Sequence, residues 1–166
     1  SSKQLIKDKL ENTDNISFKF IQKIGKETEK GECIISYPKK ILCKYDDKYN
    51  KILVSNGKSL VINSKKITNY LRYQLKDTPL NLILDKRFLL NKLENVELIR
   101  ENDETFSFKI IHNDNLLNIY FDKESYDIKG WTTTDIYLNT VETKLFDINT
   151  NKMIDKKLFR VQNYIN

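Results

Sequence analysis

The feature that most constrains the fold is a hydrophobic pattern that switches to a period of two early in the chain. Between Ile16 and Lys23 large apolar and polar side chains alternate, with Phe18 and Phe20 on the apolar side. A period of two is typical of a β-strand that buries one face. The chain has 20 isoleucines, nine tyrosines and eight phenylalanines but no alanine, which favours sheet over a helical bundle. We therefore predict a mainly β protein, a single domain over residues 1–166.

Further strand-like segments follow, separated by short turns. Asn56-Gly57, between two apolar runs, is a strong signal for a two-residue β-hairpin turn. About eleven short strands with tight turns predict a large antiparallel sheet that curls into an incomplete β-barrel. The expected strands after the first lie at 31–37, 41–46, 51–55, 59–63 and 66–74, and then at 95–101, 105–112, 115–121, 127–138, 141–148 and 158–162.

Two segments break the pattern and predict helices. Residues 2–13 place Ile6 and Leu10 on one apolar face. Residues 78–93 are the most apolar stretch of the chain, and Thr78-Pro79 is typical of an N-cap followed by proline at the first helical position. An apolar helix in a β protein needs an apolar surface on which to pack. We therefore expect short α-helices to cover the open end or concave face of the sheet as a lid.

The sequence lacks the motifs of common enzymes and metal sites. It has no glycine-rich nucleotide loop, no HExxH and no CxxC, and its two cysteines are too few for a zinc site. Its one histidine, His112, lies beside an expected turn with no nucleophile pattern near it, and we interpret it as a surface residue. The carboxylates at Asp46-Asp47 and 101–104 are interpreted as solvated turn tips. The sequence favours a binding protein with no catalysis, cofactor or metal.

The net charge of +6 raises the question of a nucleic-acid partner. The basic residues are 25 lysines and only four arginines, with no run of five. In segment 16–23 the aromatic side chains face away from the lysines, whereas a base-stacking surface needs both on one face. Residues 1–83 carry a net +8 and residues 84–166 a net −2, an asymmetry that could steer an anionic partner or membrane surface. We favour a solvated, lysine-rich surface and no nucleic acid.

The sequence contains no signal for membrane insertion. No apolar run approaches the ~18 residues of a transmembrane helix. The chain begins Ser1-Ser2-Lys3, without a charged and then apolar leader. We therefore expect either a cytosolic protein or the mature form of a secreted one, and two cysteines do not decide between these compartments.

Several short strings share a common pattern when they are taken in order along the chain. The first is Ile16-x-Phe18-x-Phe20-x-Gln22, after the first expected helix. The others are the segments Gly31–Pro38, Ile52–Leu60, Asp77–Leu84 and Asn151–Phe159. Together they cover about residues 4–160. In this order they resemble the outer-membrane lipoprotein carrier family (LolA-type periplasmic carriers): its Phe-rich first strand, its strand ending in Arg-Pro, its Ser-Asp-Gly-Lys hairpin, its Thr-Pro lid helix and its closing Leu-Asp-x-x-Leu-Phe.

The resemblance implies a periplasmic carrier. In that family an incomplete β-barrel with a helical lid shields the acyl chains of lipoproteins between an inner-membrane ABC-type lipoprotein exporter and an outer-membrane lipoprotein receptor. Each buried CH₂ contributes about 0.8 kcal/mol, so a 16-carbon chain represents roughly 12 kcal/mol of unfavourable exposure to water. The resemblance further implies a monomer that binds acylated lipoproteins, in its mature form without signal peptide.

An alternative on the same scaffold is a regulatory domain that senses a lipid or a mislocalised lipoprotein without delivering it. Such proteins usually carry a second domain, for which we expect no room in 166 residues.

Alternation from the motif positions points a set of large side chains into the cavity of such a barrel. For each of them the ordinary alternative is plain core packing. The candidates for the acyl-chain cavity are Phe18, Phe20, Cys33, Ile35, Tyr37, Ile41, Cys43, Tyr45, Leu53, Leu60 and Ile62. The lid candidates are Ile6, Leu10, Leu80, Ile83 and Leu84.

Three positions depart from the family pattern. Tyr37 stands where the family has an arginine that bonds to lid backbone, Cys43 where tryptophan is usual, and Asn163 where proline is common. Tyrosine donates one hydrogen bond where arginine donates up to five. We therefore expect this lid to depend on apolar packing, with the Tyr37 ring against Leu80 or Ile83.

The two cysteines flank a predicted hairpin turn. Cys33 and Cys43 would lie on adjacent strands and point the same way by alternation. In an oxidising periplasm they could form a cross-strand disulfide. The alternative is two small buried apolar side chains with free thiols.

Overall fold

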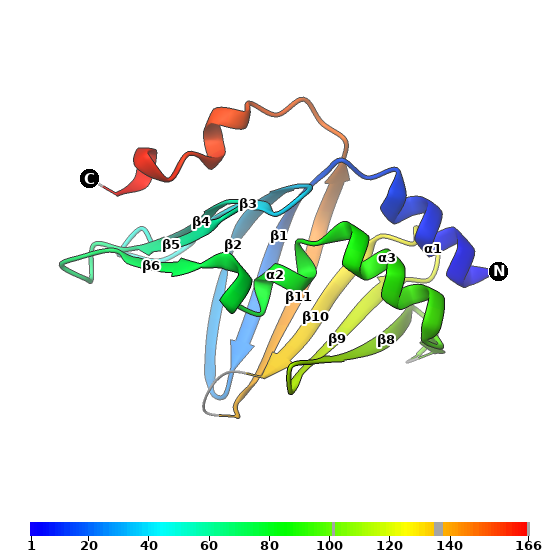
Figure 1. The fold of residues 1–166 in the computed structure, drawn as a ribbon. Helices are drawn as coiled ribbons and strands as arrows, with labels where there is room; N and C mark the ends of the chain where they lie inside the picture. Colours follow the sequence, from blue (N-terminus) through cyan, green and yellow to red (C-terminus); the bar gives the residue numbers. More distant parts are fainter. Residues whose placement is uncertain (101, 135–137, 166) are drawn as a thin grey trace.

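Eleven strands form one antiparallel sheet in the computed structural model, which describes residues 1–100, 102–134 and 138–165. The sheet curls around a concave face without closing, so β6 and β7 remain as its two edges (Figure 1). Its order is β6-β5-β4-β3-β2-β1-β11-β10-β9-β8-β7. The incomplete antiparallel barrel is therefore confirmed. The strands are β1 (Asn15–Ile24), β2 (Glu27–Ser36), β3 (Lys40–Tyr45), β4 (Ile52–Asn56), β5 (Ser59–Asn63), β6 (Leu71–Gln74), β7 (Ile99–Arg100), β8 (Thr105–His112), β9 (Asn115–Asp122), β10 (Ile128–Thr134) and β11 (Thr140–Thr150).

Short helices cover the concave face, as expected (Figure 1). The α-helices lie on the concave side of the sheet, whereas the C-terminal segment (red) runs above β3–β5 in this view and packs on their opposite face. The hairpin at Asn56-Gly57 is confirmed: Gly57 has a φ of 102°, and the Asn56 side chain accepts hydrogen bonds from the N–H groups of Lys58 and Ser59. The helices are α1 (Ser2–Glu11), α2 (Leu80–Ile83) and α3 (Lys86–Asn95), with 3-10 turns η1 (Leu75–Asp77), η2 (Lys156–Phe159) and η3 (Val161–Tyr164).

The expected strand at 158–162 is wrong. This segment forms the 3-10 turns η2 and η3. Asp155 accepts a hydrogen bond from the N–H of Lys157 at 2.9 Å and so starts η2. Phe159 and Val161 are buried in a separate core cluster against Leu42, Val54 and Val61. These apolar residues therefore alternate because they pack on the convex face of the sheet. They do not pair with an edge strand.

Other boundaries also differ from the prediction. Of the strand expected at 66–74, only Leu71–Gln74 pairs with β5. The strand expected at 95–101 is reduced to Ile99–Arg100, and α3 extends to Asn95. Residues 101 and 135–137, which fall in the expected segments 95–101, 101–104 and 127–138, lie outside the described residues.

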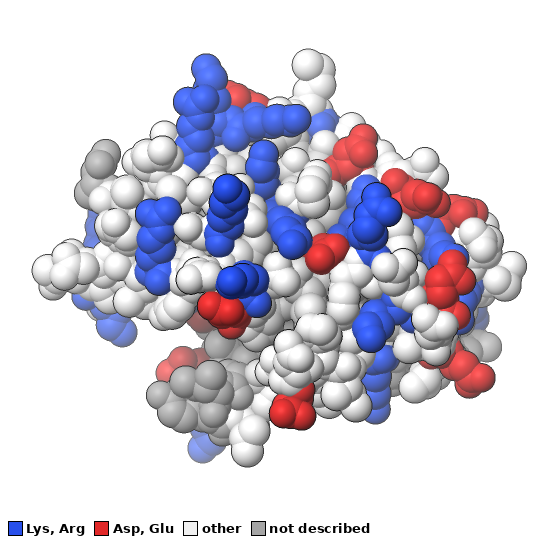
Figure 2. Space-filling model, in the orientation of Figure 1, with Lys and Arg blue, Asp and Glu red and all other residues white. Residues whose placement is uncertain are grey.

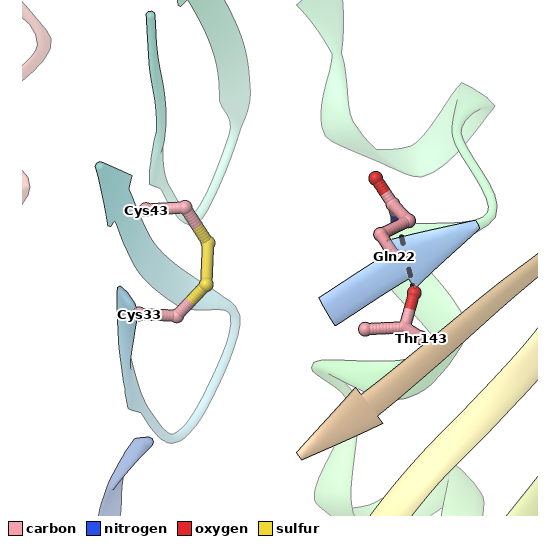
Figure 3. Close-up of a disulfide and its surroundings, with 4 residues drawn as sticks. All are labelled: Gln22, Cys33, Cys43 and Thr143. Atoms are coloured by element: carbon pink, nitrogen blue, oxygen red, sulfur yellow. Dashed lines mark hydrogen bonds between the residues drawn. A yellow bond between two sulfur atoms is a disulfide. The ribbon is translucent and has the colours of Figure 1, made fainter. Parts of the chain in front are cut away.

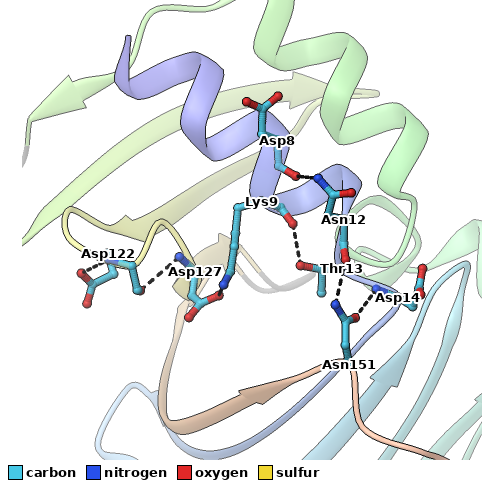
Figure 4. A network of polar contacts seen from close by, with 9 residues as sticks. Asp8, Lys9, Asn12, Thr13, Asp14, Asp122, Asp127 and Asn151 are labelled. Atoms are coloured by element: carbon cyan, nitrogen blue, oxygen red, sulfur yellow. Dashed lines mark hydrogen bonds and ion pairs between the residues drawn. The ribbon is translucent and has the colours of Figure 1, made fainter.

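A polar network fixes the corner where α1 leads into β1 (Figure 4). Asn151, directly after β11, accepts a hydrogen bond from the N–H of Asp14 at 2.7 Å and donates to the carbonyl of Asn12 at 2.8 Å. Its φ of 56° lies in the left-handed region, which asparagine tolerates. On α1 itself, Lys9 pairs with Asp127 at 3.5 Å. These contacts attach the C-terminal end of α1 to the sheet and explain the asparagine of the C-terminal string.

Candidate functional site

A cavity of about 290 Å³ lies between the concave face of the sheet and the segment 78–83. The wall comes from β1–β5 on one side and from β10 and β11 on the other. Large apolar side chains make up most of this wall, as is usual for small-molecule and lipid sites. The structure places nine of the eleven cavity candidates on it: Phe18, Phe20, Cys33, Ile41, Cys43, Tyr45, Leu53, Leu60 and Ile62.

Two cavity candidates do not line this space. Ile35 follows Cys33 on the same face of β2 but is 1% exposed in the core cluster that contains Ile6 and Leu10. Tyr37 contacts a separate small space beside Leu10 and does not line the cavity. Alternation placed both on the concave face correctly, but Ile35 is fully packed in the core and Tyr37 borders Leu10 of α1.

The lid candidates divide in the same way. Leu80 and Ile83 line the cavity. Ile6, Leu10 and Leu84 do not line it and are almost completely buried in the main core. These three residues hold the helices to the sheet, and only the first two face the hollow.

The predicted N-cap at Thr78 is wrong. Its hydroxyl donates to the carbonyl of Leu75 at 2.8 Å, within the preceding 3-10 turn. Pro79 then occupies the N-cap position of α2 without a side-chain hydrogen bond. The chain therefore passes from the 3-10 turn η1 directly into α2. Thr78 and Pro79, between the two, add to the cavity lining.

Two pairs of aromatic rings contact each other along the wall. Phe18 and Trp131 meet edge to face with ring centroids 6.3 Å apart, and Phe20 and Tyr45 do so at 5.2 Å. Burial, and to a smaller degree the carboxylates of Glu29 and Asp47, raises the pKa of Tyr45 above its ordinary value. The phenol is therefore neutral at physiological pH and adds to an uncharged lining.

The glycine of the second motif explains how two of these rings can meet. Gly31 lies between Phe20 and Tyr45 in the pairing of β1, β2 and β3. A Cβ at this position would lie 2.3 Å from the carbonyl oxygen of Lys44 and 3.0 Å from the Phe20 ring. Any side chain here would push the rings or β3 away.

A disulfide joins Cys33 and Cys43 in the wall between β2 and β3 (Figure 3). The two residues face each other in the register, with Cα atoms 4.1 Å apart. The predicted cross-strand disulfide is therefore present, and the alternative of two free thiols is wrong. A structural disulfide is consistent with an oxidising compartment.

A polar strip borders the cavity on the side away from the disulfide (Figure 3). Gln22 donates a hydrogen bond to the Thr143 hydroxyl at 2.9 Å, and Thr133 and Thr134 of β10 lie on the same border. The alternation of β1 points Gln22 to the same face as Phe20, so this residue could have been found from the sequence. Trp131 and the threonines of β10 and β11 were not among the sequence candidates, because they lie in none of the five strings that carry the resemblance.

The lid is attached through backbone and charge, not through Tyr37. The N–H of Lys39 donates to the carbonyl of Leu84 at 3.0 Å, and its ammonium pairs with Asp85 at 3.8 Å. The Tyr37 hydroxyl is buried and has no hydrogen-bond partner among the described residues, and burial raises its pKa above the ordinary value. The Lys86 ammonium lies 5.2 Å from the centre of the Tyr37 ring. The Tyr37 side chain therefore does not hydrogen-bond to the lid as the arginine of the family is expected to do.

Neither a group of metal ligands nor a membrane-spanning helix lies among the described residues. His112, expected at the surface, is half-buried with its ring 5.3 Å from that of Phe88 in α3. No group of three or more potential metal ligands gathers in the described part of the chain. Within those residues, no helix has the length and apolarity needed to cross a bilayer.

Comparison with known proteins gives a family match and several fold matches. No curated protein sequence is significantly similar to this chain. The fold is similar to an uncharacterized conserved protein from Thermus thermophilus, with a TM-score of 0.58 and 9% identity, covering 96% of this chain and 94% of the other. It is also similar to a putative outer membrane lipoprotein-sorting protein domain from Vibrio parahaemolyticus, with a TM-score of 0.50 and 10% identity, covering 98% and 99%. The Pseudomonas aeruginosa MucA/MucB complex matches with a TM-score of 0.54 and 9% identity, covering 96% of this chain and 60% of the other.

At such low identities these structures show the fold alone. The sequence itself matches the family described as "Outer membrane lipoprotein carrier protein LolA" over residues 11–162, which is most of the chain. That family consists of carriers and not enzymes. The expected resemblance is therefore confirmed, and the chain belongs to the LolA family of outer membrane lipoprotein carrier proteins.

Proposed function

We propose that this protein is a periplasmic carrier that shields the acyl chains of lipoproteins in its cavity and delivers them from an inner-membrane exporter to an outer-membrane receptor. The observation that supports this most is an apolar hollow under a short lid, next to a concave face that is otherwise filled. A soluble domain that leaves such a space between large side chains gives up packing energy unless a ligand fills it. An acyl chain has the apolar surface to do so.

The cavity volume indicates that the lid moves during loading. About 290 Å³ is at the lower end of the range for ligand sites, which begins at roughly 300 Å³. Two or more acyl chains therefore need additional space. The helix α2 has only four residues, and its attachment at Lys39 consists of one backbone hydrogen bond and one partly exposed ion pair. Breaking these two polar contacts costs about 1–2 kcal/mol, and exposing the buried side chains of Leu82 and Ile83 adds to that cost. Burial of an acyl chain, at about 0.8 kcal/mol for each CH₂, can supply both.

A second candidate is a sensing domain that binds a lipid or lipoprotein and signals to a protein partner. The fold similarity to MucB in its complex with MucA supports keeping this candidate. The two functions differ in what happens to the cargo. A carrier releases lipoprotein from a membrane and passes it on, whereas a sensor binds without release.

The test is release of radiolabelled lipoprotein from spheroplasts that contain a competent exporter. We expect the purified protein to bring lipoprotein into the supernatant. Leu80→Glu, which puts a charge on the cavity side of the lid, should reduce release at least tenfold, because a carboxylate and an acyl chain cannot share an apolar site. Leu116→Glu is the matched control on an exposed position of β9 and should release normally. Absence of release by the unmodified protein would favour the sensor.

A further inference from the structure

The edge strand β6 exposes apolar side chains beside the cavity. Leu71 is 44% exposed and Tyr73 47% exposed. In the antiparallel register Tyr73 is opposite Leu60 and Leu71 is opposite Ile62. Directly opposite residues share a face of the sheet, and Leu60 and Ile62 line the cavity. The apolar wall of the cavity therefore continues across β6 to the free edge of the sheet.

Basic side chains surround this edge. Figure 2 shows Lys and Arg spread over the part of the face that carries β5, β6 and α2, next to a hollow in the surface. The β5–β6 loop contributes two of these residues, β6 one, and the turns at the other end of the hairpin two. All five are exposed, and none forms an ion pair with another described residue. They are Lys58, Lys65, Lys66, Arg72 and Lys76.

We propose that the β6 edge, with these five basic residues and the side chains of Leu71 and Tyr73, is a contact surface for an anionic lipid bilayer. Lysine and arginine attract anionic headgroups, tyrosine prefers the interface, and an exposed leucine gains by insertion. The proposal rests on the proposed carrier function. An acyl chain could then move between the bilayer and the cavity along Leu71 and Tyr73 without crossing water.

A bilayer fits this edge better than a peptide strand does. A peptide that extends a sheet depends on a row of backbone hydrogen bonds, but β6 has only four residues. Short edge strands with a charged side chain, here Arg72, are a common protection against such pairing. The apolar side chains also point to the concave face, where they are accessible beside the hollow and not along the edge.

The experiment measures binding of the purified protein to sedimented vesicles. The vesicles contain phosphatidylcholine alone or with phosphatidylglycerol, and no lipoprotein or exporter is present. We expect binding only to the anionic vesicles, weakened by salt. Lys58→Gln/Arg72→Gln/Lys76→Gln should reduce binding about 100-fold, at roughly fivefold per charge. Leu71→Ser/Tyr73→Ser should reduce it at least tenfold while the charge is unchanged.

Matched controls remove the same groups from the other half of the molecule. Lys3→Gln/Lys109→Gln/Lys123→Gln lowers the net charge by the same three units, from +6 to +3. Ile111→Ser/Leu116→Ser removes an exposed cross-strand apolar pair of β8 and β9. Both control variants should retain binding within about threefold.

Three results would overturn the proposal. These are equal losses in the control and test variants, normal binding by Leu71→Ser/Tyr73→Ser, or binding to a soluble poly-glutamate peptide but not to vesicles. The cavity variant Leu80→Glu separates this proposal from the carrier function: it should lose lipoprotein release but keep binding to anionic vesicles within the roughly fivefold that one added negative charge costs.

Discussion

The two halves of the concave face differ in how they are covered, although the same sheet forms both. Under α1 and α3, each ten residues long, the face is filled: Leu89 and Leu93 of α3 and Phe108 of β8 are completely buried. Under α2, which has four residues, a cavity remains between Leu80 and the strands. The length of the covering helix, and not the character of the strands, decides which half is core and which half is hollow.

This difference divides stability from function. Buried leucines on a long helix contribute packing energy that is present without any ligand. Side chains around the cavity lack part of that packing until a ligand supplies it. The packed half therefore holds the fold, and the hollow half can open when a bound ligand offsets the cost. Four predictions test this division, from the largest expected effect to the smallest.

The largest expected difference is between a glutamate placed in the sheet and a glutamate placed in the lid. Phe20→Glu buries a carboxylate at the centre of the sheet and should leave the protein unfolded at 25 °C. Ile83→Glu lies on the lid, which can swing the charge into solvent, and should keep its circular dichroism spectrum but lose retention of a fluorescent fatty acid. If Ile83→Glu unfolds as completely as Phe20→Glu, the lid is ordinary core.

Truncation of a leucine should distinguish the two covering helices. Leu89→Ala in α3 should lower the free energy of unfolding by about 2–5 kcal/mol, as is usual for a fully buried leucine. Leu80→Ala in α2 should lower it by less than about 1.5 kcal/mol, because that side chain is half-buried and already borders open space. Urea unfolding at equilibrium measures both values. Similar losses for the two variants would contradict the division into a packed and a hollow half.

The disulfide should compensate for weak packing in the hollow half. Cys33 and Cys43 are ten residues apart, and closing a loop of that length contributes about 2–4 kcal/mol. Reductant should therefore lower the free energy of unfolding by that amount in the unmodified protein. The double variant Cys33→Ser/Cys43→Ser is the control and should not respond to reductant. A reductant effect below about 0.5 kcal/mol would mean that packing alone holds this wall.

The sequence predicted the sheet and most of the cavity wall because both follow from side-chain alternation. Alternation states which face a residue is on, and Phe18, Phe20 and Leu53 are where it places them. It contains no information on what covers that face. Ile35 and Tyr37 were therefore assigned to the cavity, although Ile35 is packed in the core and Tyr37 lies beside α1.

The errors outside the cavity have a related cause. Phe159 and Val161 alternate like a strand, yet they pack as two 3-10 turns on the convex side of β3–β5. An alternating pattern shows only that every second side chain points to the same side, and not that the segment is a strand. Trp131 was missed because its partner Phe18 is more than 100 residues away, and no local pattern records that contact.

The smallest effect should come from removing the hydroxyl of Tyr37, at the position where the chain departs from its family. A buried hydroxyl without a partner costs about 1–3 kcal/mol, and none of the described residues accepts or donates a hydrogen bond to this one. Tyr37→Phe removes the hydroxyl and keeps the ring, so it should raise the free energy of unfolding by about 1 kcal/mol. Tyr37→Ala also removes the ring and should lower it by about 3–5 kcal/mol.

The same two variants test how the lid is held. Because the N–H of Lys39, and not the phenol, is bonded to Leu84, Tyr37→Phe should leave hydrogen exchange of residues 78–90 unchanged. Tyr37→Ala should speed that exchange, because the turn that carries Lys39 loses its support. If Tyr37→Phe speeds exchange as much as Tyr37→Ala does, the hydroxyl is a latch in solution, and the lid depends on Tyr37 as the family's lid depends on its arginine.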